Sequence, residues 1–268
     1  MIDQLKEPLI TVVTVVLNMK EDLEKTIRSV SGQTYENIEY IIVDGGSTDG
    51  TLDVIKKYQY AISSYISEPD KGIYDAMNKG IRMASGLWVN FMNAGDVFYN
   101  SNSVSSLRNY FQQDTAVIYG DVRIEHNDLE RTQYAESFSR LRKGMVCCHQ
   151  SVFIKKQVLD SVVFDLEYSL AADYDLLCRI YLAGFHATKV DMVISKVIGG
   201  GQGDVKRVEV LRQFLMISCK NFKSIATFLN IKYQALISLE YIKLFLKKYL
   251  PRNLVYFFIK YKYSNAKK

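Results

Sequence analysis

Acidic residues recur at the ends of predicted strands within the first hundred positions. Asp44 ends one strand before a glycine turn, Asp70 and Asp75 follow another strand, and Asp96 closes the turn at residues 93–96. In an open α/β sheet, ligands bind outside the carboxyl ends of the strands, so these carboxylates can face one ligand. Glycines beside them let the backbone approach a phosphate closely. The spacing therefore predicts a site for a nucleoside diphosphate.

The elements that must position these acids alternate between strand and helix. Residues 9–17 are β-branched and almost wholly apolar, which is typical of a strand buried on both faces of a parallel sheet. Leu23, Ile27 and Val30 then share one helical face. Repetition of this pattern predicts an α/β fold whose mostly parallel sheet carries helices on both faces. We expect strands at 9–17, 38–43, 62–67, 87–92 and 115–122, and helices that follow residues 22, 50, 72, 103 and 171.

Two further segments have a looser pattern. The polar stretch at residues 125–136 indicates a solvated loop or hairpin. The glycine-rich segment at 199–203 is typical of a mobile loop rather than the interior of an element.

The turn at residues 43–51 reads Val-Asp-Gly-Gly-Ser-Thr-Asp-Gly-Thr. A carboxylate at its start, Asp44, can accept a hydrogen bond from a ribose hydroxyl or from a base N–H. Alternatively, Asp44 and Asp49 cap the helix that follows. The motif gains meaning only beside the other acidic turns.

Several other kinds of chemistry lack their signatures. No Gly-x-Gly-x-x-Gly follows the first strand and no P-loop sequence occurs, which argues against hydride transfer and ATP hydrolysis. The four cysteines show no Cys-x-x-Cys spacing and only three histidines are present, so a zinc site is not expected. Reduced, structural thiols are the expected state, although the adjacent Cys147 and Cys148 leave a redox pair as an alternative.

Four motifs in order resemble those of family 2 glycosyltransferases, and most closely the bacterial exopolysaccharide enzymes of the colanic-acid type. They are a first strand ending at Asn18, the turn at 43–51, the stretch Ser-Glu-Pro-Asp-Lys-Gly-Ile-Tyr-Asp-Ala-Met-Asn-Lys-Gly at 67–80, and Asn-Ala-Gly-Asp at 93–96. The likeness covers roughly residues 8–201. It implies a GT-A fold, a nucleotide-sugar donor and inversion at the anomeric carbon.

The resemblance also assigns the nucleotide contacts. The acid that ends the second strand falls on Asp44, while the family's second acid in that turn is replaced by Gly45. Instead of contacting the nucleotide, Asp75 and Asn78 could simply lie on the solvent-exposed side of an amphipathic helix. The residues assigned to the nucleotide are Val15, Asn18, Asp44, Asp75, Asn78, Ala94 and Gly95.

The family's metal motif falls on residues 93–96, where only Asp96 retains an acid. The resemblance thus makes Asp96 the ligand of Mg²⁺ or Mn²⁺, hard cations that suit carboxylate and diphosphate oxygens. A helix cap or turn residue is the structural alternative for Asp96.

Asp173, in the sequence Ala-Asp-Tyr-Asp, matches the family's catalytic base, which removes the proton of the acceptor hydroxyl. Asp175 is the structural residue of this pair, since it can cap the helix or pair with Arg179 one helical turn later. His149 and Gln150 resemble a motif before the acceptor region, which would place them near donor phosphate or acceptor. The alternative for His149 is a core histidine with a satisfied hydrogen bond.

Charge divides the chain at residue 204. The net charge of +5 combines −7 over residues 1–204 with +12 over residues 205–268, where 14 basic residues face two acids. We expect a catalytic domain at 1–204 and a basic amphipathic helical tail at 205–268 that meets an anionic membrane surface. The alternative is a helical subdomain packed on the catalytic core. Nucleic acid is not expected as a partner.

No stretch approaches the roughly 20 apolar residues of a membrane-spanning helix, and residues 1–8 lack the basic start of a secretory signal. A cytoplasmic protein, peripheral on the cytoplasmic face of the inner membrane, is therefore expected. Its expected activity is the transfer of a sugar to a lipid-linked or oligosaccharide acceptor in cell-surface polysaccharide synthesis. The expected lipid is a polyprenol. The alternatives are a sugar nucleotidyltransferase and a non-catalytic binder of saccharide or nucleic acid.

Overall fold

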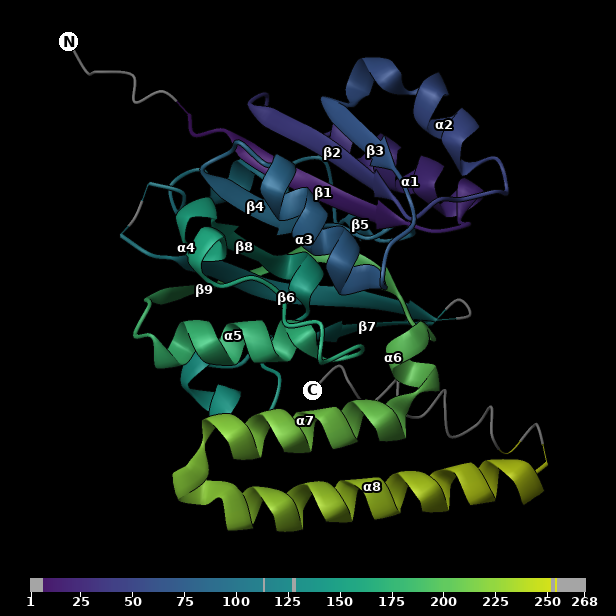
Figure 1. Ribbon diagram of the computed structural model, residues 1–268, viewed down its shortest axis with the longest axis vertical. Helices are drawn as coiled ribbons and strands as arrows, with labels where there is room; N and C mark the ends of the chain where they lie inside the picture. The colour runs from purple at the N-terminus through teal and green to yellow at the C-terminus, as the bar shows by residue number, and fades with distance from the viewer. Residues whose placement is uncertain (1–6, 113, 127–128, 252–253, 255–268) are drawn as a thin grey trace.

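The computed structural model describes residues 7–112, 114–126, 129–251 and 254. One curled sheet runs through the molecule, with helices against both faces (Figure 1). The strand order is β3-β2-β1-β4-β8-β6-β9-β5, and β7 pairs with β6. The strands are β1 (Ile10–Val16), β2 (Ile38–Asp44), β3 (Ser64–Ser67), β4 (Trp88–Phe91), β5 (Val97–Phe98), β6 (Val117–His126), β7 (Leu129–Gln133), β8 (Val152–Lys155) and β9 (Ala187–Ile198).

The first half of the sheet is parallel. β1 lies between β2 and β4, and its register places Val16 opposite Asp44. Every residue of β1 is buried, because its alternate side chains enter two different apolar clusters. Val13 and Val15 pack on the face covered by α3, whereas Val12 and Val16 pack on the face covered by α1. The carboxyl ends of these strands form the edge that carries the acids.

The helices arise from the predicted apolar faces. α3 approaches β1 closely at Gly80, where an added Cβ would lie 2.4 Å from Val13 Cγ1. The helices are α1 (Lys20–Ser31), α2 (Thr51–Lys57), α3 (Ile73–Met83), α4 (Lys156–Ser161), α5 (Ala172–Leu182), α6 (Gln202–Val205), α7 (Arg207–Asn221) and α8 (Ala226–Tyr249). Short 3₁₀ segments occur at Gln59–Ala61, Ser105–Leu107, Phe138–Lys143, His149–Ser151 and Lys223–Ile225.

The second half of the sheet corrects the prediction of a mostly parallel sheet. β8 is antiparallel to both β4 and β6, β5 is antiparallel to β9, and only β6 and β9 run parallel here. Strands β8 and β9 were not predicted. The alternation of Val190, Met192 and Ile194 along β9 was the available signal. The hairpin alternative at 125–136 is confirmed by the pairing of β6 with β7.

The helix predicted after residue 103 is also wrong, because only the turn Ser105–Leu107 forms there. Asn and Ser side chains in this stretch bond to nearby backbone instead: Asn100 accepts from the Asn102 N–H, and Ser105 donates to the Asn102 carbonyl. At residues 199–203, α6 begins inside the segment that was expected to be a loop.

The tail forms a helical hairpin against the rest of the molecule. α7 and α8 lie antiparallel below α5 (Figure 1). Leu211 and Ile217 of α7, and Leu229 and Tyr233 of α8, belong to the same apolar cluster as α3 and α5. The side of the hairpin that faces α5 therefore matches the alternative prediction, in which the tail is a helical subdomain packed on the core. The division of the chain at residue 204 stays a prediction.

Candidate active site

Asp44, at the end of β2, is hydrogen-bonded into the edge formed by the carboxyl ends of the parallel strands. Its side chain is 0% exposed. Its Oδ2 accepts hydrogen bonds from Ser67 Oγ at 2.6 Å and from the Ser47 N–H at 3.1 Å. These bonds connect the ends of β2 and β3 to the glycine turn. The nucleotide contact expected of Asp44 stays a prediction.

The end of β1 is tied to the same turn. Asn18 has a left-handed φ of 52°, its N–H donates to Ser47 Oγ at 2.7 Å, and its Oδ1 accepts the Thr48 N–H at 2.8 Å. On the other side of β1, the Ala94 N–H donates to the Val15 carbonyl at 3.2 Å. The residues predicted at the ends of β1, β2 and β4 thus lie at one edge of the sheet.

Asp75 and Asn78, both in α3, meet different surroundings. Asp75 Oδ2 accepts the Lys71 N–H at 3.0 Å, in the loop before the helix. Asn78 is buried, and both ends of its amide bond to the backbone of Phe164, at 2.9 and 3.0 Å. The structure thus gives Asn78 a packing contact, and a nucleotide role for either residue stays a prediction.

Asp96 lies in a tight turn after β4. Gly95 adopts a left-handed φ of 95°, and the Asp96 N–H returns to the Asn93 carbonyl at 3.0 Å. Thr26 of α1 fixes this turn, since its Oγ1 accepts the Gly95 N–H and donates to the Asp96 carbonyl. Burial raises the pKa of the Asp96 carboxyl to about 6, against the opposing effect of Gln150 and His149.

The residues of this turn are suited to a hard cation. Asn93 Oδ1 is a buried oxygen with no hydrogen-bond partner, and the Asp96 carboxylate lies in the same turn. Amide and carboxylate oxygens are the ligand types that Mg²⁺ and Mn²⁺ bind. Among the described residues, no group of three or more His, Cys, Asp and Glu side chains could hold a metal by itself. A diphosphate would have to supply the remaining ligands.

Asp173 lies in the first turn of α5. Its Oδ1 accepts the Tyr74 hydroxyl at 3.2 Å and the Tyr174 N–H at 2.8 Å, while its Oδ2 lies 3.4 Å from His149 Nδ1. Burial first, and then the charge of Asp173, raise the pKa of Tyr74 well above its usual value. Tyr74 therefore keeps its proton and donates to Asp173.

Asp175 takes the structural role weighed for it. It is 1% exposed, and its Oδ2 lies 2.7 Å from Arg179 Nε one helical turn later.

His149 and Gln150 join the turn at Asp96 to Asp173. Gln150 Nε2 donates to Asp96 Oδ2 at 2.5 Å, and His149 Nε2 lies 3.0 Å from Asn93 Nδ2 while its Nδ1 faces Asp173. Two adjacent side chains thus contact both acids. Two carboxylates 77 positions apart in sequence share one polar network.

Sequence reasoning missed three members of this network: Tyr74, Asn93 and Cys148. Burial raises the pKa of Cys148 to about 12, so it remains a thiol and donates to Gln150 Oε1 at 2.8 Å. Tyr74 and Asn93 stood inside quoted motifs, but no spacing rule links Tyr74 to a residue 99 positions later. Only their contacts reveal these roles.

With this geometry in place, residues 11–161 match the family model described as glycosyl transferase family 2. The chain belongs to this family. A "PGL/p-HBAD biosynthesis glycosyltransferase" of Mycobacterium tuberculosis is 28% identical over 180 residues, which cover 65% of this chain and 70% of the relative. The chondroitin synthase of Escherichia coli is 22% identical over 77% of this chain and 31% of the synthase.

Solved glycosyltransferases share the fold. The mannosyltransferase PcManGT from Pyrobaculum calidifontis, solved with GDP-Man and Mn²⁺, superposes with a TM-score of 0.66 at 16% identity, covering 86% of this chain and 70% of that one. S. aureus TarS has a TM-score of 0.61 at 15% identity and covers 78% of this chain, which spans 39% of that longer protein. The predicted GT-A fold is confirmed.

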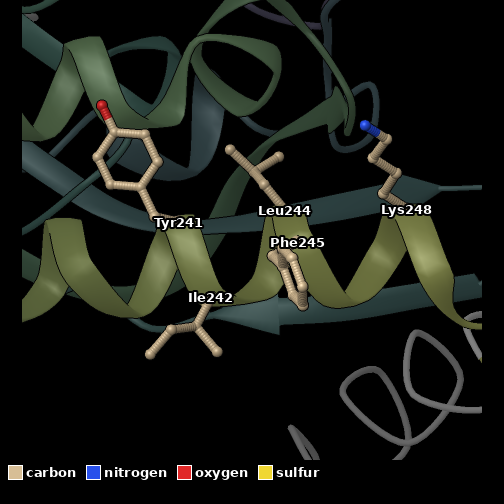
Figure 2. Close-up of a pocket in the computed structure, with 5 residues that line it drawn as sticks. All are labelled: Tyr241, Ile242, Leu244, Phe245 and Lys248. Carbon is tan, nitrogen blue, oxygen red and sulfur yellow. The ribbon is translucent and has the colours of Figure 1, made fainter.

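A hollow lies on the outer part of α8, away from the acids. It is open and lined by Tyr241, Ile242, Leu244, Phe245 and Lys248, which project from successive turns (Figure 2). None of the helices in the described part of the chain is long and apolar enough to cross a membrane.

Proposed function

We propose that the protein is an inverting glycosyltransferase that moves a sugar from a nucleoside-diphosphate donor to a saccharide acceptor. Family membership supports transfer, and the solved neighbours include complexes with UDP-GlcNAc and GDP-Man. The observation that carries the proposal is the bridge formed by His149 and Gln150. It brings Asp96, suited to the diphosphate, together with Asp173, suited to the acceptor.

In this reaction Asp173 is the general base. Its carboxylate takes the proton of the acceptor hydroxyl while that oxygen forms a bond to the anomeric carbon. The bond between that carbon and the phosphate oxygen breaks, and the nucleoside diphosphate leaves with the electron pair. Attack from the face opposite the leaving group inverts the configuration.

Hydrogen bonds to Asp173 hold this base in one orientation. The Tyr74 hydroxyl and the Tyr174 N–H both donate to Oδ1, which leaves Oδ2 toward His149. A carboxylate held in this way needs no reorientation before proton transfer.

Asp96 and Asn93 are the residues that would hold Mg²⁺ or Mn²⁺ with the donor diphosphate. The cation, when bound, neutralises charge that develops on the leaving diphosphate. Gln150 orients the Asp96 carboxylate by donating to its Oδ2.

We further propose that the acceptor is a saccharide linked to a polyprenol lipid. The reaction would then belong to the synthesis of bacterial exopolysaccharide or another cell-surface polysaccharide. The mycobacterial relative is named for a biosynthetic pathway, and the Escherichia coli relative is a polysaccharide synthase by name. The outer surface of α8 supports contact with a membrane that carries such an acceptor.

An exposed apolar stripe runs along α8 on the side opposite its buried residues. Its members recur at intervals of three, four, seven or eight residues, which places them on one helical face. The stripe comprises Phe228, Ile231, Leu239, Ile242, Leu246 and Tyr249, each between 45% and 67% exposed. Lys232 and Lys243 lie on the same helix. An apolar stripe beside cations suits a helix that lies in the interface of an anionic bilayer.

The membrane contact is tested by co-sedimentation with vesicles containing phosphatidylglycerol. The double variant Ile231→Ser/Ile242→Ser should lower the bound fraction, because it removes apolar side chains from the stripe. Tyr60→Ser is the control, since Tyr60 is 80% exposed but lies outside the tail. An unchanged bound fraction, or loss of a dimer by light scattering instead, would contradict a membrane role.

The transferase proposal is tested with UDP-, GDP- and dTDP-sugars in the presence of Mn²⁺. One donor should raise the melting temperature, because a ligand that binds the folded state stabilises it. NMR of the product made from that donor should show an inverted anomeric centre. Retained configuration would overturn the inverting mechanism, and absence of any donor binding would overturn the proposed function.

A further inference from the structure

We propose that Asp70, rather than Asp44, presents the carboxylate that the nucleoside of the donor contacts. Asp44 in turn holds the shape of the turn. The inference rests on the proposed function, since it assigns a specificity-determining residue within the same donor site. Three observations support it: the burial of Asp44, the space above Gly45, and the way the loop at residues 67–72 is fixed.

Asp44 has no surface to offer a ligand. Its side chain is fully buried, and Ser67 Oγ and the Ser47 N–H already donate to its carboxylate. A nucleoside could reach it only if these bonds broke and the strand ends separated. The carboxylate therefore fixes the strand ends to the turn.

Gly45 leaves a space that Asp70 fills. A Cβ added to Gly45 would lie 2.4 Å from Asp70 Oδ2 and 3.4 Å from Leu17 Cδ1. The backbone of Gly45 is not in the left-handed region, so a side chain is excluded by Asp70 rather than by φ. The Asp70 carboxylate thus occupies the place that a side chain on the turn would take.

The loop holds Asp70 in this place. Asp70 Oδ1 accepts the Gly72 N–H at 2.8 Å, and Lys79 Nζ donates to the Pro69 carbonyl at 2.9 Å. The Glu68 N–H donates to the Asp44 carbonyl at 3.0 Å, which joins the loop to the turn. Among the described residues, none donates a hydrogen bond to Asp70 Oδ2. This oxygen is an anchored acceptor that is free for a ligand.

The surroundings of Asp70 suit a nucleoside. Leu17 is 51% exposed beside the same space, so an apolar surface adjoins a carboxylate. A planar base can pack on the apolar side chain while the carboxylate accepts a base N–H or a ribose O–H. The base N–H and the ribose O–H are both hydrogen-bond donors, and a carboxylate favours ligands that present such donors.

The test moves the carboxylate from residue 70 to residue 45, into the space that the Asp70 side chain occupies. Calorimetry on the full chain with Mn²⁺ measures the Kd of the nucleoside diphosphate selected by the donor panel. Asp70→Asn keeps an acceptor for the Gly72 N–H but removes the charge, and should weaken binding by about tenfold or more. Gly45→Asp alone should also weaken binding, because it crowds two carboxylates together.

The double variant Gly45→Asp/Asp70→Ala should recover most of the affinity, since loss of the Asp70 side chain clears the space beside Gly45 and the new carboxylate occupies it. Gly45→Asn/Asp70→Ala is the matched control, with the same bulk and no charge, and should remain weak. Melting temperatures establish that each variant is folded. Recovery in the uncharged control, or an Asp70→Asn affinity equal to that of the parent chain, would overturn the inference.

A 2′-deoxy nucleoside diphosphate identifies the partner. If the ribose donates, the effect of Asp70→Asn should shrink with the deoxy ligand; if the base donates, the effect should be unchanged. Either result supports the carboxylate role. Failure of the parent chain to bind any nucleoside diphosphate would instead count against the proposed function.

Discussion

The two ends of the proposed site hold their carboxylates in different ways. At the donor end, Asp44, Asp70 and Asp75 accept hydrogen bonds from residues at most 23 positions away, most of them backbone N–H groups in the same turn or loop. At the reacting end, Asp96 is bound by Gln150, 54 positions later, and Asp173 by Tyr74, 99 positions earlier.

This difference indicates that the two ends of the proposed site have different functions. In the proposed reaction, local hydrogen bonds shape the rim assigned to the nucleotide part of the donor, because a turn can form its own acceptor geometry. Long-range bonds assemble the reacting groups, since base and diphosphate must approach the same sugar from different elements. Changes at Asp173 and its partners should thus lower the rate, whereas changes at Asp44, Asp70 and Asp75 should lower affinity.

The largest expected effect is that of Asp173→Asn. The amide cannot take the acceptor proton, so kcat should fall by about 10² to 10⁴-fold while donor affinity is unchanged. Steady-state kinetics together with donor calorimetry measure the two quantities. Asp191→Asn, at a carboxyl that is 90% exposed, is the control. A folded Asp173→Asn protein with near-normal turnover would remove the difference between the two ends.

A smaller effect concerns the stability of the metal-free chain. Burial raises the pKa of Asp96 from 3.8 to about 6, so folding favours its protonated form. This stabilisation is complete below about pH 4 and is lost as the pH rises through 6, for a total on the order of 3 kcal/mol. Asp96→Asn mimics the neutral form and should therefore exceed the parent in stability only at the higher pH.

Urea unfolding in the presence of a chelator measures this difference. The stability of Asp96→Asn minus that of the parent should grow between about pH 4 and about pH 7. A difference that is constant with pH would show that Asp96 is not enclosed in the way the turn indicates.

The smallest expected effect is that of Tyr74→Phe, which removes one donor to Asp173. Loss of a hydrogen bond to a charged group should lower kcat by about tenfold, and the pH profile of kcat should shift. Tyr65→Phe is the matched control, because Tyr65 is exposed on β3. If donor affinity fell and kcat did not, Tyr74 would belong with the donor end.

The sequence predicted the parts of the fold that local pattern decides. The run of β-branched residues that forms β1, the apolar face of α3 and the glycine turn after Asp44 each follow from spacing within one segment. The motifs also identified the family that the model match confirms. By contrast, the antiparallel pairing of β8 with β4 joins residues 63 to 67 positions apart, and no local period encodes it.

The sequence by itself determined which acids stand at strand ends, because strand, turn and helix signals are read within a few residues. Only the tertiary structure decided which of them are exposed and what holds them. Asp44 is buried and accepts a hydrogen bond from Ser67, Asp70 fills the space beside Gly45, and His149 with Gln150 joins Asp96 to Asp173. These relations depend on packing between distant segments, where burial and desolvation act on the carboxylates and sequence spacing carries no information.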